Sequence, residues 1–142
     1  MRNILILAIM ALPFIVACNN NSNEANTSGE NDVDAARNFI RAALDGQYRD
    51  AKSLIVADSV NQQYLEAWHT TYTERMSGED KRGYRESSIN IHNIRQINDS
   101  ATVIQYSNSY KKTQDSIKVI RENNNWLVDL KYSFAHTDSL PK

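Results

Sequence analysis

The stretch IKVIRENNNWLVDL, residues 117–130, decides the fold of this chain. Apolar and polar residues alternate on both sides of a central Asn123-Asn124 pair, as they do in two strands that share one buried face. Asparagine tolerates the positive φ that both central residues of a tight two-residue turn require. The stretch therefore predicts an antiparallel β-hairpin with Asn123-Asn124 at its tip.

The register of this hairpin follows from its own pattern. With Asn123-Asn124 as the loop, one face carries the pairs Val119–Val128, Ile117–Leu130 and Arg121–Trp126, and the other carries Ile120–Leu127 and Lys118–Asp129. The last of these is an opposite-charge cross-strand pair. A slip of one residue would move every apolar side chain to the opposite face, so we predict this register.

Segments in which apolar residues recur at every second position extend the predicted sheet towards the N-terminus. Isoleucines at 89, 91, 94 and 97 change from odd to even positions at His92-Asn93, which predicts a β-bulge there. Polar clusters at 98–100 and 111–115 are typical of turns. The sequence therefore predicts an antiparallel meander with strands over 86–97, 101–110, 116–122 and 126–132.

The preceding half of the chain has helical spacing. Apolar residues recur every three or four positions in three segments, which predicts helices over 31–45, 48–55 and 58–76. Residues 77–85 are predicted to be a loop. In the simpler interpretation, its basic cluster, Lys81, Arg82 and Arg85, is a solvated surface. We therefore expect an α+β domain over residues 31–132, with three N-terminal helices packed on a curved four-stranded antiparallel sheet.

Two stretches carry a family resemblance. AARNFIRAALDGQYRDAKSLI (residues 35–55) and the hairpin stretch together resemble the DUF4878 family of small bacterial lipoproteins, in the cystatin/NTF2-like superfamily. Asn124 stands where that family usually has glycine. The resemblance implies a curved sheet wrapped around a helix, and it implies no activity, because the family has none assigned.

Residues 1–17 are predicted to be a lipoprotein signal peptide. The apolar run from Ile4 to Val16 is too short for a membrane-spanning helix, which needs about 20 apolar residues. Its end, Ile15-Val16-Ala17-Cys18, resembles a bacterial lipobox, and by that resemblance Cys18 is the lipidated first residue of the mature protein. The alternative is an ordinary secreted protein. Cys18 is the only cysteine, which excludes an intramolecular disulfide.

Residues 18–30 are predicted to be the lipidated cysteine and a flexible tether, because residues 19–30 (NNNSNEANTSGE) include no large apolar side chain. Asn19, in place of an aspartate, favours the outer membrane over the inner one by resemblance to lipoprotein sorting signals. We therefore expect a lipid-anchored protein of the bacterial cell envelope that faces the periplasm. Residues 133–142 are predicted to be a polar tail.

Several classes of function find no support in the sequence. A net charge of −1 gives no basic surface for nucleic acid. The three histidines, His69, His92 and His136, lack the spacing of metal ligands. Asp129, the most obvious strand carboxylate, is predicted to face away from the core and to pair with Lys118. The sequence therefore favours a non-enzymatic domain without a cofactor or metal.

Aromatic side chains are the remaining candidates for a site. They suit a cavity lining or a protein interface as well as an ordinary core, and the candidates are Tyr64, Trp68, His69, Tyr72, Tyr106 and Trp126. We expect binding of a partner protein or glycan near the membrane. The alternatives are a small-molecule binder that uses the cavity between sheet and helices, and a cavity enzyme of isomerase or hydratase type. A homodimer through an outer sheet face with Ile104, Ile120 and Leu127 stays open.

Overall fold

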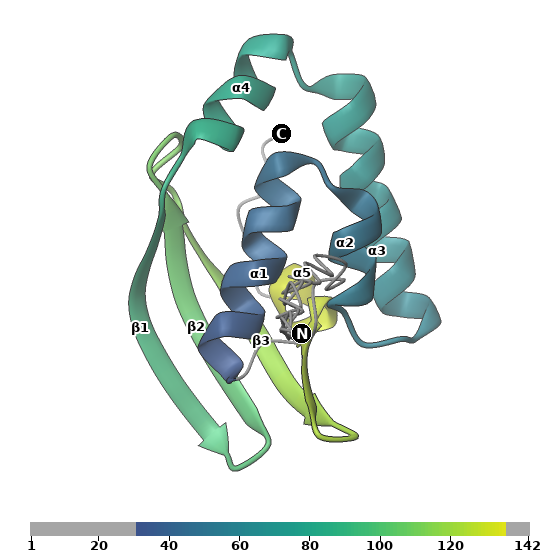
Figure 1. Cartoon of the computed structure of the whole chain (residues 1–142), viewed down its shortest axis with the longest axis vertical. Coiled ribbons are helices and arrows are strands. Elements are labelled where there is room, and N and C mark those ends of the chain that lie inside the picture. The colour runs from purple at the N-terminus through teal and green to yellow at the C-terminus, as the bar shows by residue number, and fades with distance from the viewer. Residues whose placement is uncertain (1–30, 136–142) are drawn as a thin grey trace, which may run out of the picture.

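The protein is an α+β domain with helices packed on one face of a sheet (Figure 1). The computed structural model describes residues 31–135 of the 142-residue chain. The predicted signal peptide, Cys18, the tether and residues 136–142 lie outside the described residues. The sheet is antiparallel and four-stranded in the order β1-β2-β3-β4. The predicted α+β class and the four-stranded antiparallel sheet are therefore confirmed.

The helices precede the strands along the chain, except for one short helix that follows the last strand. Their order is α1 (Asp32–Asp45), α2 (Tyr48–Ser53), α3 (Ser59–Thr70), the π-helical turn η1 (Thr71–Arg75), α4 (Gly78–Glu86), β1 (Ile89–Asn98), β2 (Ala101–Asn108), β3 (Gln114–Glu122), β4 (Asn125–Asp129) and α5 (Leu130–Ala135). Between residues 31 and 135, none of the helices has the length and apolar character needed to cross a bilayer.

The hairpin of β3 and β4 has the predicted register. Val119 lies opposite Val128, and Lys118 lies opposite Asp129. Both turn residues, Asn123 and Asn124, have positive φ, at 48° and 67°. The predicted bulge is also confirmed, since the β1–β2 register shifts between Ile91 and Asn93.

Two predicted elements are wrong. Residues 77–85 belong to helix α4 rather than to a loop, because Ser77 caps it by accepting a hydrogen bond from Asp80 N at 3.0 Å. The fourth strand ends at Asp129 instead of 132, because the Leu130 N–H donates to Asn61 Oδ1 at 2.7 Å and leaves the ladder. The Ile117–Leu130 pair therefore does not form, and the predicted polar tail begins inside α5.

The core lies between α1 and the concave face of the sheet, which curves around this helix in Figure 1. Its fully buried members include Ile40 on α1 and Ile117 and Val119 on β3. Ile104 is also fully buried and pairs with Ile117, so its predicted place on the outer face is wrong. Ile120 and Leu127 do lie on the outer face, where both are half-buried.

A buried polar joint connects α3 to the end of β4. Asn61 is completely buried; it accepts a hydrogen bond from Leu130 N, and its amide donates to Asp58 Oδ2 at 2.8 Å. The same Asp58 oxygen pairs with Lys131 Nζ at 2.7 Å. Asp58 also caps α3 through the backbone N–H groups of residues 60 and 61. One asparagine therefore fixes α3 against the start of α5.

The turn of the last hairpin gives a test of the backbone. Alanine has a Cβ, which disfavours the positive φ of residue 124, whereas glycine has none. Asn124→Ala should therefore have a free energy of unfolding about 1 kcal/mol lower than that of Asn124→Gly. Both variants lose the hydrogen bond that Arg121 donates to Asn124 Oδ1 at 2.6 Å, so the glycine variant isolates the backbone term. Urea unfolding measures the difference. Equal stability of the two variants would contradict the left-handed turn.

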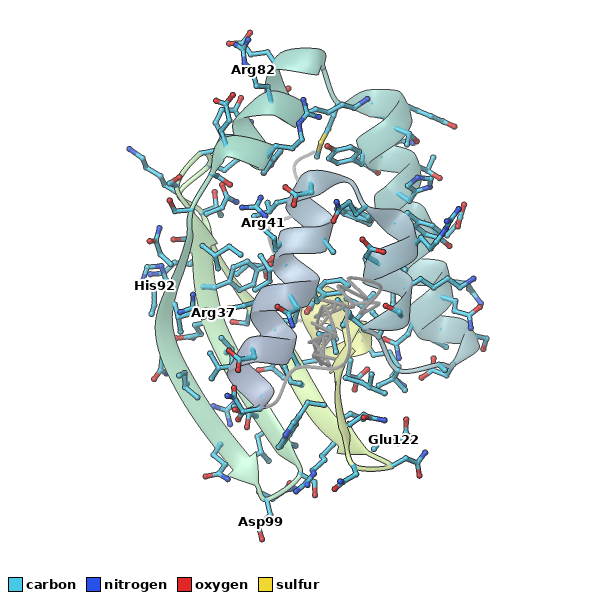
Figure 2. All side chains as sticks on the ribbon, viewed as in Figure 1. Arg37, Arg41, Arg82, His92, Asp99 and Glu122 are labelled. Atoms are coloured by element: carbon cyan, nitrogen blue, oxygen red, sulfur yellow. The ribbon has the colours of Figure 1, made fainter. Side chains whose placement is uncertain are left out.

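The Asp58 joint predicts a dependence of stability on pH. The hydrogen bond from Lys131, together with the backbone N–H of Asn61, holds the pKa of Asp58 well below its usual value of 3.8. Because the folded pKa is lowered, the stabilisation is present above that usual value and is lost as pH falls below it. Urea unfolding between pH 6 and pH 2 should show a shallower acid-side decline for Asp58→Asn than for the wild type. Asp99 lies at the exposed β1–β2 turn (Figure 2), and Asp99→Asn should lose stability with falling pH as the wild type does. If Asp58→Asn loses stability as steeply as the wild type, Asp58 is not the source of the pH dependence.

Candidate ligand-binding cavity

A cavity of about 370 Å³ lies between α1, α3 with η1, and the concave face of the sheet. Its volume is within the range of small-molecule sites. Its walls are mostly aromatic and aliphatic, and include Phe39, Ile40, Ala43, Leu44, Tyr64, Leu65, Trp68, Tyr72, Tyr84, Tyr106 and Ile117. The space is therefore shaped for an apolar body.

The aromatic wall follows from spacing along one helix. Tyr64, Trp68 and Tyr72 are four positions apart, so they share a face that runs from α3 into η1. The Trp68 and Tyr72 ring centroids are 5.7 Å apart, with the rings tilted by 40°. Across the cavity, α1 contributes Phe39, Ile40, Ala43 and Leu44, of which Ala43 has the shortest side chain.

Four of the six predicted site residues line this cavity, namely Tyr64, Trp68, Tyr72 and Tyr106. His69 does not, because it follows Trp68 by one position and its ring packs on Tyr48 at 4.4 Å between centroids. Trp126 does not either. It lies opposite Arg121 near the hairpin tip, whereas the cavity reaches the other end of β3.

Asp115 is a wall residue that the sequence prediction missed. The sequence predicts a turn over 111–115, but β3 begins at Gln114, and Asp115 pairs with Tyr106 across the sheet. The Tyr106 hydroxyl lies 3.5 Å from Asp115 Oδ2, and Ser116 N donates to Oδ1 at 2.7 Å. Extending the register from the buried Ile104–Ile117 pair by two residues on each strand would have found this pair.

The charged groups of the cavity wall are all acidic: Asp115 lines it, and no basic side chain of the described residues does. Burial raises the pKa of Asp115, although the hydrogen bonds from Ser116 N and Tyr106 oppose this effect. Burial also raises the pKa of Tyr106, and the neighbouring Asp115 adds to this effect. No lysine, arginine or histidine of the described chain is among the lining residues. The cavity wall therefore carries one ionisable carboxylate at its edge.

Tyr72, one of the lining residues, carries a buried hydroxyl without a hydrogen-bond partner among the described residues. Buried hydroxyls are normally paired, because desolvating one without a partner costs roughly 1–3 kcal/mol. The ring also packs so closely on Gly46, which has a φ of 74°, that no side chain would fit there.

Helix α4 is fastened to the β2–β3 turn beside the cavity. Asp80 Oδ1 accepts a hydrogen bond from the Tyr110 hydroxyl at 3.0 Å and pairs with Lys111 Nζ at 3.1 Å. A Cβ on Gly83 would overlap the Tyr110 ring, so the two elements approach closely at a glycine. Since Tyr84 of α4 also lines the cavity, these contacts, which we call the α4 clasp, position part of its wall.

Arg41 of α1 holds the other end of α4. Its guanidinium donates to Ser87 O at 2.8 Å and to Tyr84 O at 3.1 Å (Figure 2). The basic cluster predicted for this segment is divided. Lys81 donates to Thr73 O at 3.0 Å, whereas Arg82 extends away from the fold in Figure 2.

Comparison of the chain with protein-family models, curated proteins and solved structures finds no match. The resemblance to DUF4878 lipoproteins therefore stays a prediction. Within the described residues, no group of three or more histidine, cysteine, aspartate or glutamate side chains is placed to hold a metal ion. What the geometry does provide is an aromatic cavity with a carboxylate at one end.

Two glycines of α4 offer a matched test of the α4 clasp. Gly78→Ala should leave stability unchanged or raise it by up to about 1 kcal/mol, because a Cβ there meets open space. Gly83→Ala should be less stable than Gly78→Ala by about 1–2 kcal/mol, since it displaces Tyr110 from Asp80. Urea unfolding of both variants decides this, and a stabilising Gly83→Ala would contradict the close approach.

Proposed function

We propose that this domain binds a small, largely apolar molecule in the cavity between α1, α3 and the sheet. The observation that carries the proposal is a cavity of about 370 Å³ that is lined by aromatic and aliphatic side chains. Ligand sites combine such walls with a small number of polar groups that fix orientation. Rigid rings also lose little side-chain entropy when a ligand packs on them.

The polar groups of the wall indicate how such a ligand is oriented. Tyr106 and Asp115 are paired across β2 and β3, and Asn108 lies two residues further along β2. All three belong to the end of the sheet where α4 is fastened. The polar end of the ligand therefore lies near Asp115, with its apolar part along Trp68 and Phe39.

The place of this domain in the cell is also a proposal. The lipobox-like residues 15–18 and the polar segment 19–30 support a lipid anchor on Cys18 and a tether at the bacterial outer membrane, facing the periplasm. The curved sheet around α1, with α2 and α3 beside it, supports a cystatin/NTF2-like assignment. Binding of a protein or glycan partner, a homodimer, and isomerase or hydratase chemistry stay predictions.

A cavity-filling variant tests the proposed function. Ala43→Phe should abolish the rise in melting temperature, about a degree or more, that a bound amphiphile or sugar produces in a thermal-shift screen. Ala67→Phe makes the same change on the exposed side of α3 and should keep the rise. Equal shifts in both variants would place binding elsewhere, and no shift in the wild type with any compound would contradict the proposal.

The two tryptophans provide an optical readout. Trp68 lines the cavity and Trp126 does not, and the chain contains no others. A ligand should therefore change the fluorescence of Trp126→Phe as it does that of the wild type. Trp68→Phe should lose this change. A signal that follows Trp126 instead would overturn the position of the site.

A further inference from the structure

We propose that the cavity selects ligands that carry a positively charged amine or ammonium group, an inference that rests on the proposed function. Two features of the wall support it independently. Several aromatic side chains line the space, and its one lining carboxylate, Asp115, has no basic side chain beside it among the lining residues. An organic cation is the ligand chemistry that satisfies both features.

The aromatic faces supply attraction for a cation. A ring presents negative electrostatic potential on its face, and the attraction grows when the cation is removed from water. Tryptophan is the strongest partner, and Trp68 packs beside Tyr72 within 5.7 Å. The other rings of the wall are Phe39, Tyr64, Tyr84 and Tyr106.

The single carboxylate supplies the charge. Asp115 accepts one hydrogen bond from Ser116 N and lies 3.5 Å from the Tyr106 hydroxyl, but it has no ion-pair partner among the residues that the structure describes. Both of its hydrogen-bonding neighbours are neutral. Asp115 is exposed to water at this edge, so a ligand cation would pair with it without displacing a basic side chain.

The neighbouring lysines do not reverse this preference. Lys111 is paired with Asp80 at 3.1 Å and lies 6.0 Å from the centroid of the Tyr84 ring. Lys81 donates to the backbone of Thr73 at 3.0 Å and lies 5.6 Å from the centroid of the Tyr72 ring, which leaves Trp68, Phe39, Tyr64 and Tyr106 as the rings of the wall for a ligand cation. Neither lysine is among the lining residues. A ligand carboxylate would thus meet the negative charge of Asp115 and find no basic side chain in the wall.

Three probes with one carbon skeleton test the inference on the full-length protein. They are 4-phenylbutylamine, which is a cation, 4-phenylbutanol, which is neutral, and 4-phenylbutyrate, which is an anion. Dissociation constants come from Trp68 fluorescence in the Trp126→Phe background. The amine should bind at least about fivefold more tightly than the alcohol, and the carboxylate more weakly than either.

Removal of the carboxylate separates its part from that of the rings. Asp115→Asn should reduce the amine's advantage over the alcohol by about threefold or more, because asparagine keeps the shape of the side chain and removes its charge. Asp99→Asn removes the same charge at the distant β1–β2 turn and should keep the full advantage.

The outcomes distinguish this inference from the proposed function. Equal binding of amine and alcohol, or an advantage that Asp115→Asn does not reduce, overturns the cation selectivity while the cavity remains a binding site. Binding of none of the three probes overturns the proposed function together with the inference.

Discussion

The buried amide of Asn61 is the interaction on which the arrangement of the layers depends. It has no access to water, so its polar atoms must be satisfied within the fold. It accepts from the Leu130 backbone and donates to Asp58, which in turn caps α3 and pairs with Lys131. The start of α3 and the end of β4 are therefore fixed against each other. Since α3 carries the aromatic wall, this joint also sets the position of the cavity.

Further polar contacts hold the same frame from other sides. Thr102 of β2 is completely buried and donates to Asp32 at 2.6 Å, which fastens the start of α1 to the sheet. Arg41 and the α4 clasp hold the opposite end. A packed interior normally leaves few voids. Here a cavity of about 370 Å³ lies between the layers, and Ala43 is among the residues that line it.

The sequence predicts those parts of the fold that depend on local pattern. The Asn123-Asn124 turn fixes the hairpin register because alternation on both strands agrees with it, and Tyr64, Trp68 and Tyr72 were found because they share one helical face. The errors come from tertiary contacts. β4 ends early because of Asn61. The predicted face of Ile104 is wrong because its side of the sheet is set by the pairing of β2 with β3, which places it opposite the buried Ile117. Asp115 was missed for the same reason.

The Asn61 joint also constrains the order in which the chain can fold. It connects residues that are 69 positions apart, and residues 54–56 pair with β4 through Val128 in the same region. Contacts between such distant positions form slowly, because a long loop must close first. Synthesis proceeds from the N-terminus. The apolar faces of the first helices therefore stay exposed to water until the last hairpin has been synthesised. Folding of this domain is therefore completed by the end of its final strand, and a chain that stops before residue 130 lacks the partner that Asn61, at the start of α3, requires.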